Sequence, residues 1–167
     1  MAASPRGRHF LRPADAARFV AAAGVRPGEL VLDLGAGHGA LTSALLDAGA
    51  RVVAVELDRR AAKLLARRYP DARVVHGDLL TVPLPRRPYR VVANLPFATT
   101  TAALRRLLDP RGQLQRADLV VQWGAAVGWS QRRVRGFDLS LGHRIRARCF
   151  VPPPSVDAAV LHVTRRR

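Results

Sequence analysis

The chain has 167 residues, 49% of them apolar, so it is long enough for one domain with a packed core and too apolar for an intrinsically disordered chain. Its 28 basic residues outnumber its 12 acidic residues and give a formal net charge of +16, which favours a polyanionic partner such as a nucleic acid. The sequence has no apolar run of the roughly 18 residues that a membrane span requires, no signal peptide and only one cysteine, which excludes a disulfide framework. We therefore expect a cytoplasmic protein that forms one domain over residues 1–167 and does not enter membranes.

The first half of the chain alternates between predicted helices and strands. Pro13 suits the first turn of a helix, and Gly24 suits its end. A short apolar run at 30–34 is typical of a buried strand, and the glycine-rich segment 35–39 connects it to the next helix. The pattern predicts helices over 13–24, 40–48 and 58–68, and strands over 30–34, 51–57 and 73–76.

The second half continues this alternation less regularly. Residues 124–136 fit either a helix or a mobile arginine-rich loop. The other expected elements are strands over 89–93 and 118–123, a helix between them that Thr99 or Thr100 caps, and a closing antiparallel pair over 137–150 and 157–164. Strands that alternate with helices are typical of an α/β fold in which a mostly parallel sheet has helices on both faces.

A glycine-rich loop marks the first candidate site. The segment from Asp33 to Gly39 follows a predicted strand and opens a helix, so its backbone can approach a ligand closely and the helix N-terminus offers free N–H groups. In an open parallel sheet, ligands bind at the carboxyl ends of the strands, where Glu56 and Asp78 are also expected. Glu56 can accept the hydroxyl protons of a ribose, and Asp78 can accept a hydrogen bond from an adenine amino group.

This loop alone does not name the cofactor. Gly35, Gly37 and Ala40 also satisfy the looser dinucleotide fingerprint, so a nicotinamide cofactor stays open. Two features favour S-adenosylmethionine: Asp33 offers negative charge near a sulfonium, and the chain is short for a dehydrogenase with its usual substrate domain. The plain alternative is a tight strand-to-helix turn beside a solvated Glu56.

The second candidate site is the tetrapeptide Asn94-Leu95-Pro96-Phe97, which ends the strand beside the glycine loop. The N6 nitrogen of adenine is a poor nucleophile, because its lone pair is delocalised into the ring. The side-chain oxygen of Asn94 and a backbone carbonyl near Leu95 can accept its two hydrogens and hold it in line with a methyl donor. Pro96 stiffens the turn, and Phe97 can stack on a base that is unpaired or flipped out of its duplex. Neither a strong base nor a metal is needed for this chemistry.

A second aromatic wall of the target pocket can come from Phe150, which precedes the segment Val151-Pro152-Pro153-Pro154. Ordinary core packing is the alternative for this side chain.

These segments together resemble the erythromycin-resistance (Erm) rRNA adenine N6-methyltransferases and their KsgA-type relatives, over nearly the whole chain. The tetrapeptide 94–97 and the late motif 150–160, in this order and spacing, are strongly specific, and the segment 7–11 resembles the family's N-terminal cofactor segment. The resemblance implies that the cofactor contacts are His9, Leu11, Asp33, Gly35, Gly37, Glu56, Leu57, Asp78, Leu79 and Asn94. It implies that the catalytic residues are Asn94, Leu95, Pro96, Phe97 and Phe150.

By this resemblance, the fold is the class I, Rossmann-like methyltransferase sheet of seven strands and the cofactor is S-adenosylmethionine. The implied substrate is 23S rRNA, and the implied consequence is resistance to macrolides, lincosamides and streptogramin B. We expect the enzyme to be a monomer. Two departures from the family are visible. Arg8-His9 stand where the family usually has Gln-Asn, and the chain stops at Arg167, before the small helical RNA-binding domain with which the family usually continues.

Several alternatives stay open. Phe97 favours the Erm type over a KsgA-type small-subunit rRNA dimethyltransferase, because KsgA-type proteins typically have tyrosine there. Enzymes that methylate DNA adenine or protein glutamine usually have proline where Leu95 stands. Outside the methyltransferases, the alternatives are a nicotinamide oxidoreductase and a non-catalytic RNA-binding or ribosome-assembly factor.

Arginine clusters in the last third of the chain predict where RNA phosphates bind, because a guanidinium can contact two phosphate oxygens at once. Our hypothesis is that these clusters, together with Arg6, Arg8 and Arg12, form one face around the pocket mouth. The alternative explanation is that these arginines are ordinary surface charge from a GC-rich genome, which favours arginine over lysine, since Lys63 is the only lysine. The candidate RNA-binding residues are Arg132, Arg133, Arg135, Arg144, Arg146 and Arg148.

Overall fold

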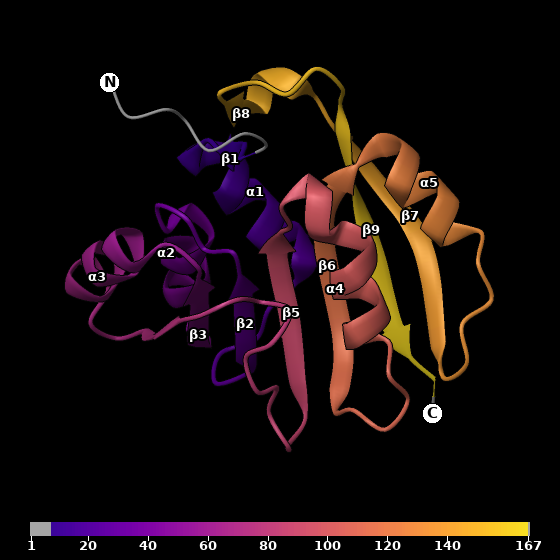
Figure 1. Cartoon of the computed structure of the whole chain (residues 1–167), viewed down its shortest axis with the longest axis horizontal. Helices are drawn as coiled ribbons and strands as arrows, with labels where there is room; N and C mark the ends of the chain where they lie inside the picture. Colours follow the sequence, from indigo (N-terminus) through magenta and orange to yellow (C-terminus); the bar gives the residue numbers. More distant parts are fainter. Residues whose placement is uncertain (1–7, 167) are drawn as a thin grey trace.

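A seven-stranded sheet runs through the middle of the computed structural model, which describes residues 8–166 (Figure 1). Its strands are β2 (Leu30–Leu34), β3 (Arg51–Glu56), β4 (Arg73–His76), β5 (Tyr89–Asn94), β6 (Leu114–Gln122), β7 (Phe137–Ile145) and β9 (Ala158–Arg165). They lie in the order β4-β3-β2-β5-β6-β9-β7, in which the first five are parallel and β9 is antiparallel to both of its neighbours. The predicted mostly parallel α/β sheet of seven strands is confirmed.

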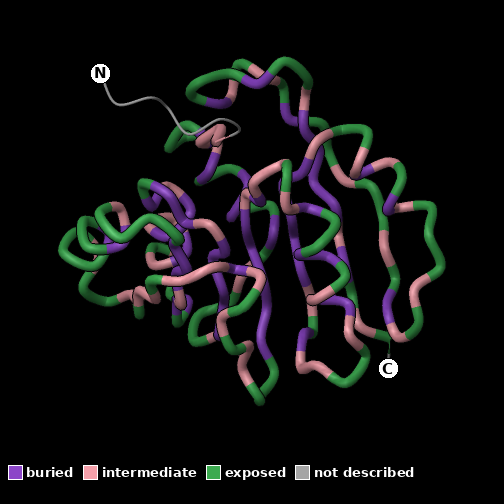
Figure 2. Tube along the Cα trace, viewed as in Figure 1, coloured by how far each residue is buried: buried purple, intermediate pink, exposed green. Residues whose placement is uncertain are grey.

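Helices cover both faces of this sheet, as predicted. One face carries α1 (Pro13–Ala23), α2 (Ala40–Asp47) and α3 (Arg59–Arg68), and the other carries α4 (Thr100–Leu107) and α5 (Trp123–Ser130). All five residues of β2 are buried, and the central strands are the most continuously buried part of the chain in Figure 2. Leu32 belongs to the core under α4 and α5, whereas Val31 belongs to the core under α1 and α2. Within residues 8–166, no helix is long and apolar enough to span a membrane.

Some predicted boundaries differ from those of the structure. Strand β6 begins at Leu114, four residues before the predicted start, and residues 124–130 of the undecided segment belong to helix α5, which begins at Trp123. Residues 146–151 leave the sheet and form the short 3₁₀ helix η2 (Ala147–Cys149) and strand β8 (Phe150–Val151). Thr99 does not cap α4, because its hydroxyl donates to the carbonyl of Pro96 within the 3₁₀ helix η1 (Phe97–Thr99).

A second, two-stranded sheet was not predicted. Strand β1 (Phe10–Leu11) pairs antiparallel with β8, so that Phe10 lies opposite Val151 and Leu11 opposite Phe150. The two strands lie together at the top of Figure 1, beyond the upper ends of β5 and β6. We call residues 8–12 the N-terminal segment, because this pairing brings them across the carboxyl ends of the main sheet.

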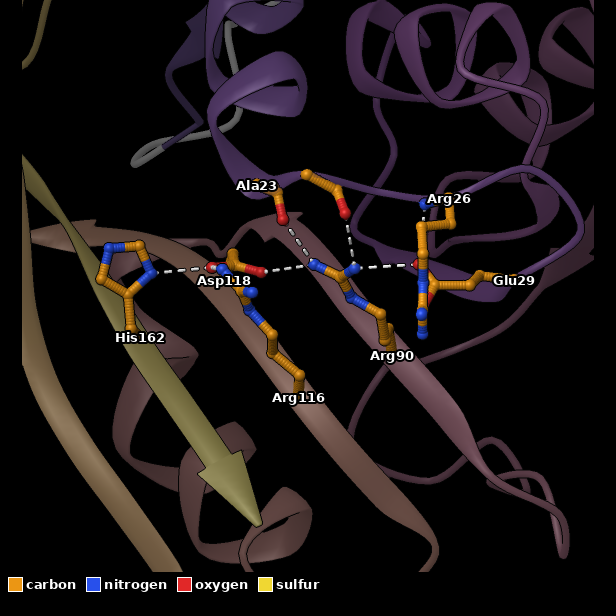
Figure 3. A network of polar contacts seen from close by, with 8 residues as sticks. Ala23, Arg26, Glu29, Arg90, Arg116, Asp118 and His162 are labelled. Atoms are coloured by element: carbon orange, nitrogen blue, oxygen red, sulfur yellow. Dashed lines mark hydrogen bonds and ion pairs between the residues drawn. The ribbon is translucent and has the colours of Figure 1, made fainter.

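A buried carboxylate joins three strands of the main sheet (Figure 3). Asp118 of β6 is fully buried and accepts hydrogen bonds from the Nη2 atoms of Arg90 on β5 and Arg116 on β6, each at 3.1 Å. Nδ1 of His162 on β9 lies 2.7 Å from the same carboxylate. A buried charge is tolerated only where such partners replace water, so this cluster constrains how the three strands lie.

The same arginine also anchors the end of α1. Arg90 donates to the carbonyl oxygens of Ala23 at 2.8 Å and Gly24 at 3.2 Å, and it forms an ion pair with Glu29 at 2.9 Å. Burial works to raise the pKa of Glu29, but hydrogen bonds from Arg26 and Arg90 outweigh it and hold this pKa below its usual value. Arg90 therefore neutralises two carboxylates and satisfies helix carbonyls that have no partner within the helix.

We expect Asp118→Ala to lower the free energy of unfolding by about 3 kcal/mol, because Arg90 would stay buried with part of its counter-charge removed. Urea denaturation followed by circular dichroism measures this loss. Arg116→Ala is the matched control, since Arg116 contacts the same carboxylate from a more solvated position and its removal should cost much less. Equal losses in the two variants would contradict a specific role of the Arg90–Asp118 pair.

Candidate cofactor and target site

The glycine loop follows β2 directly and requires glycine at Gly37. The backbone φ of Gly37 is +56°, a region that L side chains rarely adopt, and a Cβ atom there would lie 2.4 Å from the ring of Phe10. The amides of Gly35 and Ala36 donate to the carbonyl of Val55 at 2.8 and 3.0 Å. The loop is therefore held against the end of β3, and no room remains for a side chain between it and the N-terminal segment.

Glu56, the last residue of β3, is 1% exposed, and both of its carboxylate oxygens are engaged. Oε2 accepts from the amide of Gly37 at 2.8 Å, and Oε1 accepts from the amide of Asp58 at 2.8 Å. Oε1 also accepts from Nη2 of Arg8 at 2.8 Å. The predicted ribose ligand is thus present at the edge of the sheet, and the N-terminal segment supplies its ion-pair partner.

Asp33 lies near the end of β2 and is buried, with its Oδ2 accepting from the Thr42 hydroxyl at 2.7 Å. Burial raises the pKa of Asp33 to about 7, and the negative charge of Glu56 adds to this shift, while the hydrogen bonds from Thr42 act in the opposite direction. The expected negative charge at Asp33 is therefore only partly developed at neutral pH in the free protein.

The third strand end carries Asp78, whose Oδ1 accepts from the amide of Leu80 at 2.8 Å. Leu79 is buried and would contact a Cβ atom on Gly35 at 3.7 Å, so it packs against the glycine loop. Leu57, another predicted cofactor contact, is 58% exposed. Asp78 and the two carboxylates described above follow or end three adjacent strands, β2, β3 and β4, and so they belong to one edge of the sheet.

A cavity of about 550 Å³ opens between the N-terminal segment, the glycine loop and α2. This volume is typical of sites for small molecules. Four of the predicted cofactor contacts line this cavity: Leu11, Asp33, Gly35 and Asn94. A narrower cavity of about 30 Å³ connects His9 and Glu56 with the tetrapeptide.

Asn94, the last residue of β5, is oriented by the N-terminal segment. Its Nδ2 donates to the backbone carbonyl of His9 at 2.7 Å, which leaves Oδ1 as the free acceptor of the amide. Leu95 is buried, and its amide donates to the carbonyl of Val120 on β6 at 3.1 Å. The tetrapeptide is thus fixed between the N-terminal segment and the neighbouring strand.

The aromatic surroundings of the tetrapeptide differ from the prediction. Phe97 is partly exposed, and its ring centroid lies 5.5 Å from that of His9. The carbonyl of Pro96 accepts from the amide and the hydroxyl of Thr99, which fixes the turn. Phe150 is completely buried in the core under α1 and α2, where it packs as its alternative predicts, and its contact with a target base stays a prediction. The ring of His9 takes the place beside Phe97.

The predicted single arginine face differs from the structure. One cluster (Arg132, Arg133, Arg135) lies on the loop that leads to the amino end of β7, and the other (Arg144, Arg146, Arg148) lies at and beyond its carboxyl end. Most of the length of β7 separates them, a distance of about 24 Å from its first residue to Arg144, so the two clusters lie at opposite ends of the sheet. Only the second cluster shares the carboxyl edge with Asn94, where Arg12 donates to the carbonyl of Arg148 at 3.1 Å. Arg6 lies outside the described residues.

Two contacts of the site were missed from the sequence. Thr42 is a buried polar residue in α2, and its place in the first turn after the glycine loop was an available signal. Arg8 was assigned to RNA phosphates, whereas the structure pairs it with Glu56. No local pattern indicates that pair, because it depends on the path of the N-terminal segment.

The sheet order and the glycine loop beside three strand-end carboxylates define a class I methyltransferase. Residues 6–167 match the family described as ribosomal RNA adenine dimethylase. The chain therefore belongs to that family, whose members are S-adenosylmethionine-dependent methyltransferases.

Individual relatives agree with this assignment. The chain is 40% identical over 146 residues to the mycinamicin-resistance protein MyrB of Micromonospora griseorubida, covering 81% of this chain and 47% of that protein. It is 44% identical over 126 residues to the ribosomal RNA small subunit methyltransferase A of Leifsonia xyli subsp. xyli, covering 70% and 45%. The crystal structure of the 23S rRNA methyltransferase ErmE superposes with a TM-score of 0.84 at 32% identity, covering 94% of this chain and 70% of that chain. The chain spans about half the length of the curated relatives it matches.

The site fits S-adenosylmethionine by its donor set. Glu56 offers a carboxylate for ribose hydroxyls and Asp78 one for an adenine amino group, and Gly35 and Ala36 of the glycine loop line the larger cavity. The Arg8 side chain competes for Glu56, because it already contacts Oε1.

We expect cofactor affinity to rise with pH up to about 7 and to level off above, because a cationic ligand favours the ionised form of Asp33, and binding then releases a proton. Calorimetry in buffers of different ionisation enthalpy measures that release. Asp33→Asn should abolish it, and Thr42→Val should move the rise to higher pH, since the hydrogen bond to the ionised form is lost. Unchanged proton release in Asp33→Asn would assign the titration to another group.

We expect Arg8→Gln to raise the affinity for S-adenosylmethionine by roughly tenfold, because the cofactor ribose would no longer compete with a charge-assisted hydrogen bond for Glu56. Calorimetry at fixed pH measures this change. Arg12→Gln, a neighbouring charge removal without contact to Glu56, is the matched control. A loss of affinity in Arg8→Gln would mean that Arg8 contacts the cofactor itself.

Proposed function

We propose that this chain transfers a methyl group from S-adenosylmethionine to the exocyclic N6 of an adenine in 23S rRNA. The observation that carries this proposal is the orientation of Asn94. Its amide nitrogen is engaged by the His9 carbonyl, so its oxygen is the free acceptor, and it lies on the same edge as Glu56 and Asp78. An acceptor in that position suits an amine whose hydrogens must be held while its nitrogen reacts.

The roles of the protein groups follow from the weak nucleophilicity of N6. Asn94 Oδ1 and the backbone carbonyl at Leu95 accept its two hydrogens and turn the nitrogen lone pair toward the cofactor. The rings of Phe97 and His9 flank the space beside the tetrapeptide, where a base that has left its stack can be held by stacking. The turn at Pro96, fixed by Thr99, keeps these groups in place without the substrate.

When bound, S-adenosylmethionine supplies an electrophilic methyl group and keeps the electron pair of the broken carbon–sulfur bond on sulfur. One N6–H bond is exchanged for an N6–carbon bond, and the proton passes to water, since it becomes acidic once the nitrogen is alkylated. The site therefore needs hydrogen-bond acceptors at N6 more than a strong base.

The large-subunit target is supported by Phe97 and by the similarity to ErmE. The similarity to the mycinamicin-resistance protein MyrB supports antibiotic resistance as the outcome, here to macrolides, lincosamides and streptogramin B. The second candidate is small-subunit rRNA, which the relative from Leifsonia xyli favours at 44% identity. Either target would place the protein in the cytoplasm with the ribosome, and we propose that it acts there as a monomer.

Mapping the methylated base tests this proposal. The experiment is primer extension and mass mapping of rRNA from cells with and without the protein. We expect one modified adenine in 23S rRNA. A modified adenine in 16S rRNA would select the second candidate, and unmodified rRNA would contradict both.

We expect Asn94→Ala to slow methyl transfer by about 100-fold or more with little change in cofactor affinity, because the acceptor is needed mainly as the nitrogen reacts. A single-turnover assay on an rRNA fragment measures the rate, and calorimetry measures the affinity. Asn94→Asp keeps an acceptor oxygen but loses the donor to His9, so it separates the two contacts. An Asn94→Ala protein with a normal single-turnover rate would remove Asn94 from the mechanism.

A further inference from the structure

An exposed tryptophan lies on the same edge of the sheet as the tetrapeptide. Trp123 begins α5 directly after β6, and 37% of it is exposed. Strand β6 pairs with β5 so that Val120 lies opposite Asn94, and Trp123 follows three residues later. Three residues of extended chain span about 10 Å, so Trp123 lies near the tetrapeptide along the same edge.

A planar cation covers this tryptophan. The guanidinium carbon of Arg144 lies 5.1 Å from the centroid of the Trp123 ring. Nε of Arg144 donates to Oδ2 of Asp157 at 2.7 Å, and Oδ1 of Asp157 accepts from the amide of Ala147 at 2.7 Å. The amide of Trp123 donates to the carbonyl of Asp157 at 3.0 Å. One aspartate therefore holds both the ring and the cation, and 61% of the Arg144 side chain stays exposed.

The chain contains a second arginine–tryptophan pair that serves as an internal comparison. The guanidinium carbon of Arg132 lies 4.2 Å from the centroid of Trp129, which is the closer pair. Trp129, however, is only 7% exposed and belongs to the core under α4 and α5, so its ring is used for packing. Trp123 differs because its ring reaches the surface at the reacting edge.

Further positive charge lies at the same edge as Trp123. Arg12, Arg146 and Arg148 are exposed at the same carboxyl edge. Nucleobases stack on aromatic rings and on guanidinium planes, and phosphates pair with neighbouring arginines. The surface thus offers both kinds of contact that a single strand of RNA uses.

We propose that Trp123 and Arg144 form a stacking platform for an unpaired RNA base that flanks the target adenine, while Arg12, Arg146 and Arg148 hold the adjacent phosphates. This inference rests on the proposed function. A target base that enters the pocket leaves its stack, and a neighbouring base then needs a new stacking partner. The platform supplies that partner and sets the register of the RNA strand over the site.

Tryptophan fluorescence tests the platform directly. The chain has two tryptophans, so Trp129→Phe leaves Trp123 as the sole reporter. This variant is titrated with a single-stranded RNA oligonucleotide and with an abasic ribose-phosphate oligomer of equal length. We expect RNA to quench Trp123, and the abasic oligomer to bind without quenching. Unchanged fluorescence at saturating RNA would overturn the proposal.

Substitutions measure the contribution of stacking to affinity. Trp123→Leu should weaken RNA binding about tenfold and leave binding of the abasic oligomer within about twofold, while Trp123→Phe should keep most of the affinity. Arg144→Ala should weaken RNA binding more than Arg132→Ala, its matched control. Equal weakening toward RNA and the abasic oligomer in Trp123→Leu would overturn the proposal, with circular dichroism showing that each variant is folded.

A methylation assay of the parent protein separates this inference from the proposed function. Quenching by RNA without any methylation would leave the platform as an RNA contact and contradict the proposed function. Methylation of rRNA without quenching, and with a normal rate in Trp123→Leu, would contradict the platform alone.

Discussion

The buried ion pair between Arg90 and Asp118 is the constraint on which the arrangement of the site depends. It joins β5 to β6, and the further hydrogen bonds of Arg90 attach the end of α1 to both (Figure 3). These three elements carry the functional groups: β5 ends in Asn94, β6 leads into Trp123, and α1 follows the N-terminal segment. An ion pair in water would contribute little to stability, whereas a buried pair fixes geometry, because any displacement leaves a charge without a partner.

The N-terminal segment connects the two halves of the site. Arg8 contacts Glu56 on the cofactor side, and the carbonyl of His9 orients Asn94 on the target side. The next two residues form β1 and pair with β8, which belongs to the late motif. Because four consecutive residues make all these contacts, a ligand that displaces Arg8 from Glu56 also acts on the His9 carbonyl that orients Asn94. Cofactor binding and orientation of the reacting amide are therefore linked through the backbone of this segment.

The sequence predicts the sheet and its carboxylates well, because both depend on local patterns and one topological rule. Apolar runs separated by helices give β2 to β6, and parallel strands place Asp33, Glu56 and Asp78 at one edge. Phe150 could not be predicted in this way, since its burial comes from a two-residue strand paired with residues far away in the chain. The arginine clusters failed for a different reason: they are close in sequence, but a nine-residue strand carries the chain from one end of the sheet to the other between them.

The net charge of +16 is therefore a poor guide to how much RNA the chain contacts. Several arginines serve the fold: Arg106 donates to the carbonyls of Leu79 and Val82, and Arg165 donates to those of Leu114 and Gly112. Such contacts cap strand and loop carbonyls that would otherwise be buried without donors. An arginine held in this way keeps its charge, but its donors are occupied and do not pair directly with a phosphate. What distinguishes the carboxyl edge is the combination of exposed arginines with an exposed tryptophan, because phosphates attract any cation but only a flat surface accepts an unpaired base.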